Sequence, residues 1–113
     1  MAFDGTEGAM ISESDARQFM SNYNSGPCIT WNQGVKGHFF GKDIIEELLN
    51  QQGAKGIRIY YGSKEQDGKP LEPQLILVAA DANQDDILNA NKIADASRPC
   101  PIFCPKNTGL TLP

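Results

Sequence analysis

The stretch GIRIYYGSKEQDGKPLEPQLILVAA, residues 56–80, decides the fold class. Its first part, residues 56–62, alternates like a strand with two distinct faces. Its last part, residues 74–80, shows no polar alternation, which predicts a central strand covered on both faces. The dipeptide Asp67-Gly68 between them is typical of a hairpin turn. The stretch therefore predicts two antiparallel strands joined by a solvated tip.

The two faces of the first strand differ in their side chains. Ile57, Ile59 and Tyr61 would share one face, whereas Arg58 and Tyr60 lie on the other. Because the neighbouring strand is apolar on both faces, something must cover the face that holds Arg58 and Tyr60. The tail or the N-terminal helix is one candidate, and a small ligand held by Arg58 and Tyr60 is another. The third candidate is a second copy of the protein, most simply in a symmetric homodimer.

Two amphipathic segments before the hairpin predict helices. Over residues 13–23, apolar side chains recur at three- and four-residue steps, and Ser12 is placed to cap the first turn. Residues 43–52 carry a clearer apolar stripe that includes Leu48. Gly53 then suits the left-handed turn that closes a helix.

Helices followed by strands predict an α+β fold, with a small antiparallel sheet backed by two helices and a Pro-rich C-terminal tail. A chain of 113 residues fits one domain. We expect a flexible N-terminus over residues 1–10, a single α+β domain over residues 11–96 and an extended tail packed on it over residues 97–113. One or two short strands are expected within residues 28–40, and a short helix near residues 85–91.

Composition and charge limit the classes of partner and the cellular compartment that we expect. The net charge of −4 comes without a local cluster of Lys or Arg, which argues against nucleic acid as a partner. No run approaches the roughly 20 apolar residues that span a bilayer, so no membrane partner is expected. No basic residue precedes Arg17, unlike the start of a secretory signal, and three cysteines are too few for a disulfide framework. These features favour a cytoplasmic protein.

The cysteines near the end of the chain allow three interpretations. In RPCPIFCP, residues 98–105, a proline follows both Cys100 and Cys104. If this segment is extended, the two Cα atoms lie about 13 Å apart, too far for a disulfide. One helical turn would bring them together, but the second proline opposes it. We favour a stiff structural tail. A disulfide, or a zinc site that also uses Cys28 and His38, is the alternative.

Several motifs together resemble a group of small uncharacterised bacterial proteins. They are the second amphipathic helix, the GIRIYYG strand, the apolar strand that ends in alanines and an aspartate, and the Cys-Pro-x-x-Cys tail. The resemblance extends over roughly residues 37–105. No activity is known for this group. The resemblance therefore implies a bacterial stand-alone domain and assigns no catalytic residue.

Catalytic machinery is not evident in the sequence. His38 is the only histidine, and its neighbours place it on a half-buried strand. Residues 81–86 begin like a calcium loop, but Asp86 replaces the required glycine and Lys92 the final carboxylate, which leaves an Asx-rich turn. No nucleophile elbow or phosphate-binding loop occurs.

The sequence therefore favours a small binding or protein-interaction module over an enzyme. The alternative function is a thiol or metal protein, either redox-active or zinc-dependent, built on Cys100 and Cys104.

Overall fold

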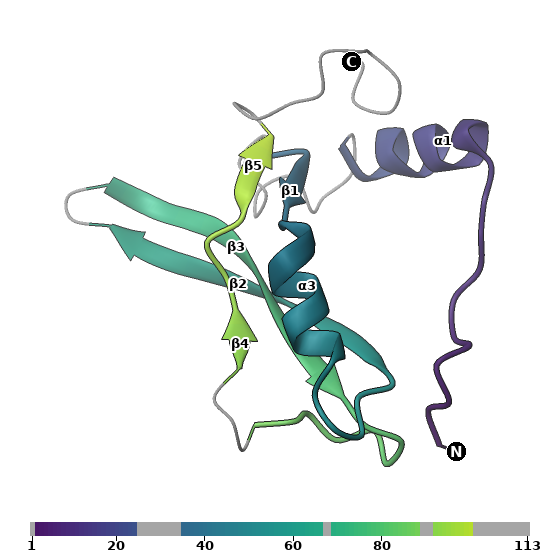
Figure 1. Ribbon diagram of the computed structural model, residues 1–113. Helices are drawn as coiled ribbons and strands as arrows, with labels where there is room; N and C mark the ends of the chain where they lie inside the picture. Colours follow the sequence, from purple (N-terminus) through teal and green to yellow (C-terminus); the bar gives the residue numbers. More distant parts are fainter. Residues whose placement is uncertain (1, 25–34, 67–68, 89–91, 101–113) are drawn as a thin grey trace.

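The computed structural model describes residues 2–24, 35–66, 69–88 and 92–100. Its elements in chain order are α1 (Glu13–Asn24), β1 (Gly37–Phe39), α3 (Lys42–Leu49), β2 (Gly56–Gln66), β3 (Lys69–Ala80), β4 (Ile93–Ala94) and β5 (Arg98–Cys100). The strands form a three-stranded sheet in the order β2-β3-β4 and a two-stranded sheet of β1 and β5, both antiparallel (Figure 1). The predicted α+β class is confirmed.

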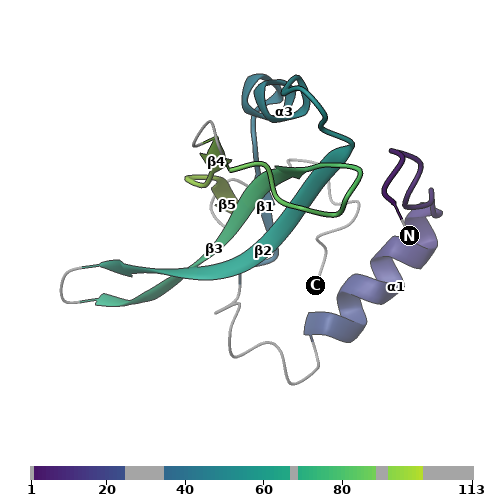
Figure 2. The same ribbon diagram turned by 90° about the horizontal axis from the view of Figure 1, so that it is seen from below.

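The hairpin of β2 and β3 is the longest feature of the fold. Its register runs from Gly56 opposite Ala80 to Lys64 opposite Glu72, with a shift before Gln66. The predicted antiparallel pairing is confirmed, and both strands are longer than the apolar pattern indicated. Each added pair completes main-chain hydrogen bonds, so the ladder continues into polar sequence. The hairpin therefore projects beyond the body of the molecule (Figures 1 and 2).

The hydrophobic core lies between α3 and one face of the larger sheet. Leu48 of α3 is 1% exposed and belongs to a buried cluster with Leu77 and Ala79 of β3 and Ala94 of β4. Of the apolar stripe predicted for this helix, Leu48 faces the sheet, whereas Ile44 and Leu49 are exposed. The backbone of Gly53 has a φ of +86°, the left-handed conformation expected after the helix.

Helix α1 forms where the sequence predicts it. The Ser12 hydroxyl oxygen accepts a hydrogen bond from the backbone N–H of Asp15 at 3.0 Å, which confirms the predicted cap. Of the two helices among the described residues, α3 packs against the sheet, whereas α1 lies apart from it in both views (Figures 1 and 2).

Strand β3 is central, with β2 on one side and β4 on the other. Its residues are buried on both faces, because Leu77 and Ala79 point to the core while Val78 and Ala80 are buried on the opposite face. The prediction of a strand covered on both faces is confirmed.

The chain after β3 differs from the prediction of a helix near residues 85–91. Backbone N–H groups of Asn83 and Asp85 donate to the Asp81 carboxylate, which forms the expected Asx-rich turn. The N–H of Ile87 then donates to the carbonyl of Ala79 at 2.8 Å. Residues 85–88 are therefore not helical, because the segment pairs with β3 instead; residues 89–91 lie outside the described part.

The expected short strands and the tail are partly described. Within residues 28–40, β1 forms a strand, while residues 28–34 lie outside the description. The start of the tail is extended as β5 and pairs with β1, with His38 opposite Pro99. Residues 101–113 also lie outside the description. Across the described ranges, no helix has the length and apolar character needed to cross a membrane.

Candidate functional site

A polar cluster occupies the face of the sheet opposite the core. Arg58 and Tyr60 project from β2, and both reach Asp86 in the segment after β3. The Nη1 atom of Arg58 lies 2.5 Å from Oδ1 of Asp86, and the Tyr60 hydroxyl donates to Oδ2 at 2.5 Å. Since Arg58 is opposite Val78 in the ladder and Asp86 pairs beyond β3, the cluster lies across β3. The cluster lies on the same face of β3 as Val78, which is 2% exposed.

Hydrogen bonds within the cluster stabilise the charges of Arg58 and Asp86. The hydrogen bond from Tyr60 is the largest cause that lowers the pKa of Asp86; the hydrogen bond and charge of Arg58 also lower this pKa, against desolvation. The hydrogen bond to Asp86 is in turn the main cause that raises the pKa of Arg58. Arg58 and Tyr60 were predicted as ligand-binding residues, and that role stays a prediction. The structure gives both an internal partner.

The sequence alone pointed to Arg58 and Tyr60 but not to Asp86. Asp86 is 28 residues from Arg58 in the sequence. Because it follows Asp85 directly, the sequence suggests two adjacent carboxylates exposed to solvent, which is a common arrangement without a functional role. Only the pairing of the segment after β3 with Ala80 brings Asp86 to the sheet.

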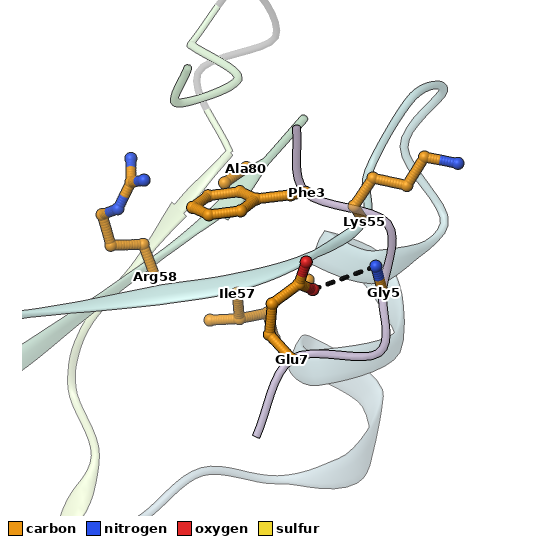
Figure 3. Close-up of a pocket in the computed structure, with 8 residues that line it drawn as sticks. Phe3, Gly5, Glu7, Lys55, Ile57, Arg58 and Ala80 are labelled. Carbon is orange, nitrogen blue, oxygen red and sulfur yellow. Dashed lines mark hydrogen bonds between the residues drawn. The ribbon is translucent and has the colours of Figure 1, made fainter. Parts of the chain in front are cut away.

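A pocket of about 360 Å³ lies beside the first residues of β2 (Figure 3). Part of its wall comes from the N-terminal segment, which is held by a 3.0 Å hydrogen bond from the N–H of Phe3 to the carbonyl of Ala82. The centroid of the Phe3 ring lies 5.5 Å from the guanidinium carbon of Arg58. The lining residues are Phe3, Gly5, Glu7, Lys55, Gly56, Ile57, Arg58 and Ala80.

The position of this pocket follows from strand geometry. Ile57 and Arg58 point to opposite faces of β2, so a pocket that contacts both reaches the strand at its outer edge. On its other side, the Glu7 carboxylate accepts hydrogen bonds from the N–H groups of Asp4 and Gly5, which fixes the N-terminal turn. Among the described residues, the pocket therefore separates this turn from the open edge of β2.

The outer edge of β2 is long, and the middle of the strand is apolar. In the described sheets β2 pairs on one side only, with β3. Three consecutive large side chains near its middle are exposed: Ile59 at 54%, Tyr60 at 44% and Tyr61 at 76%. Edge strands are usually kept short, or carry lysine or proline that prevents pairing with other chains. Strand β2 has eleven residues and no proline, and its lysine, Lys64, lies beyond the exposed apolar middle of the strand.

His38 lies half-buried on β1, as its sequence context predicts. Its Nδ1 atom and the Ser97 hydroxyl oxygen are 2.8 Å apart and share a hydrogen bond. Burial lowers the pKa of His38, and the negative charge of Glu72 partly opposes this shift. The contact with Ser97 spans 59 residues, so no sequence spacing could have indicated it.

We expect the protein to lose stability between pH 7.5 and pH 5.5 because of His38. The folded-state pKa lies below the ordinary 6.5, so the unfolded chain binds the proton more readily. The stabilising contribution is complete above about 6.5 and is lost as the pH falls through the folded-state pKa. Urea denaturation at both pH values measures the loss. His38 is the only histidine, so His38→Gln should reduce the loss; an equal loss in both proteins would contradict the assignment.

The predicted thiol or metal site is only partly within the description. Cys28 and Cys104 lie outside the described residues, and of Cys100 only the backbone, in β5, is described. The Nδ1 atom of His38 shares a hydrogen bond with Ser97. Within the described ranges, no three His, Cys, Asp or Glu residues are grouped as a metal site requires. The disulfide and zinc alternatives stay predictions.

Comparison with known proteins found no matching family model, no matching curated protein and no matching solved structure.

Proposed function

We propose that the protein is a self-associating interaction module, and that the open edge of β2 is its interface. The observation that carries this proposal is the exposure of Ile59, Tyr60 and Tyr61 on an eleven-residue edge strand. An edge strand presents main-chain N–H and C=O groups that another strand satisfies, and apolar side chains add burial to the pairing.

The other edge of the larger sheet is a much poorer interface. Strand β4 has only two residues, Ile93 and Ala94, so it offers few main-chain groups for pairing. The face of the sheet opposite the core is also a poorer candidate, because Arg58, Tyr60 and Asp86 already lie across it. This favours strand pairing at β2 over contact through a sheet face.

A second copy of the chain is the occupant that the sequence of β2 supports. An antiparallel strand can pair with an identical strand about a two-fold axis, which gives a closed dimer with one kind of interface. The middle of β2 favours this, because Arg58 is the only charged residue within residues 57–63 and its charge is paired with Asp86. Self-pairing in this region therefore buries apolar side chains without an unpaired charge.

Sedimentation velocity at micromolar concentration tests the proposal. We expect the wild-type protein to sediment as a dimer and the Ile59→Lys variant as a monomer, because a lysine at this edge opposes strand pairing. Leu88→Lys is the matched control, since Leu88 is 55% exposed and Ile59 is 54% exposed. The control should remain dimeric. A monomeric wild-type boundary, or equal dissociation of both variants, would refute the proposal.

A further inference from the structure

We infer that the pocket beside Gly56 receives residues 62–64 of a second copy, with the two Tyr60 residues opposite each other at the two-fold axis. This inference rests on the proposed self-association through β2. It adds a register to that interface and gives the pocket an occupant.

The charges of β2 select among registers. In a symmetric antiparallel pair, the numbers of opposite residues have a constant sum. Centring the pair on Tyr61 places Arg58 opposite Lys64 twice, and like charges directly opposite each other are destabilising. Centring it on Tyr60 places Arg58 opposite Gly62, which has no side chain.

The apolar side chains favour the same register. With Tyr60 at the centre, Ile59 lies opposite Tyr61 on one face, so the two most exposed apolar residues of β2 cover each other twice. A register centred on Ile59 instead places Tyr61 opposite Ile57, which already packs against the core. The register centred on Tyr60 therefore buries more of the exposed apolar surface.

This register also gives the pocket an occupant. Gly62, Ser63 and Lys64 of the second copy lie opposite Arg58, Ile57 and Gly56, and these three residues line the pocket. The space between the edge of β2 and the N-terminal segment is where an added strand must continue (Figure 3). Glycine and serine are small enough to enter beside the N-terminal turn.

Oxidative cross-linking tests the register without relying on charge. In Tyr60→Cys the two new cysteines lie directly opposite, within the Cα separation of roughly 4.4–6.8 Å that a disulfide needs. In the control Ser63→Cys the two new cysteines lie several residues apart along the paired strands. We expect a disulfide-linked dimer for Tyr60→Cys, above the wild-type background, and not for Ser63→Cys. If the wild type is dimeric but Tyr60→Cys does not cross-link, the register is wrong while the proposed function stands. A monomeric wild type overturns both.

Discussion

Leu48→Ala is expected to lower the free energy of unfolding by about 2–5 kcal/mol, the usual cost of truncating a buried leucine. Leu48 is the residue of α3 that enters the core, and it packs with Leu77 and Ala79 of β3. Because α3 is the helix that packs against the larger sheet, a cavity here weakens the main contact between the two layers. Urea denaturation measures the change.

Leu49→Ala is the control for this prediction. Leu49 is the next residue of the same helix and is exposed, so its truncation should change stability by no more than about 0.5 kcal/mol. The comparison separates loss of core packing from loss of helix propensity, since both variants replace leucine by alanine in one helix. Equal effects of the two substitutions would contradict the assignment of the buried face.

The features predicted correctly from sequence are those specified by nearby residues. The alternation in residues 56–62 and the continuous apolar run in residues 74–80 determine the hairpin, since each strand pairs with its neighbour in the chain. The stripe that contains Leu48 and the cap at Ser12 determine the two helices in the same local way. The position of a helix relative to the sheet is not specified by its own residues in this way. Nothing in the pattern of α1 indicated that it lies apart from the sheet.

The features that sequence reasoning missed depend on contacts between distant residues. Asp86 meets Arg58 and Tyr60 only because the segment after β3 pairs with Ala80 rather than forming a helix. The N-terminal segment, expected to be flexible, reaches Arg58 through Phe3. No period or motif encodes either contact, because each depends on where the hairpin has already placed its residues.

These contacts change the argument for self-association. From sequence, the reason to expect a second copy was that the face with Arg58 and Tyr60 needed a cover. In the described structure, Arg58 and Tyr60 themselves extend over β3 toward Asp86, so that face has cover from its own chain. What stays exposed is the outer edge of β2. The surface proposed for partner binding is therefore the edge of the sheet rather than its face, and at an edge main-chain pairing rather than side-chain packing sets the geometry.

The second large effect is expected at Ala79, which is 0% exposed in the same cluster as Leu48. Ala79→Leu should lower the free energy of unfolding by about 1–3 kcal/mol, because a well-packed core has no room for the added methylenes and methyl groups. The double variant Leu48→Ala/Ala79→Leu should lose less stability than the sum of the two single variants, because the new leucine side chain fills part of the cavity. Coupling of about 0.5–3 kcal/mol is usual for residues in contact.

Ala80→Leu is the control, since Ala80 is buried on the opposite face of β3. Its effect should add to that of Leu48→Ala, and denaturation of all five variants measures both sums. Additive behaviour at Ala79 would mean that the two side chains do not share one cavity, and that α3 approaches β3 elsewhere along the strand.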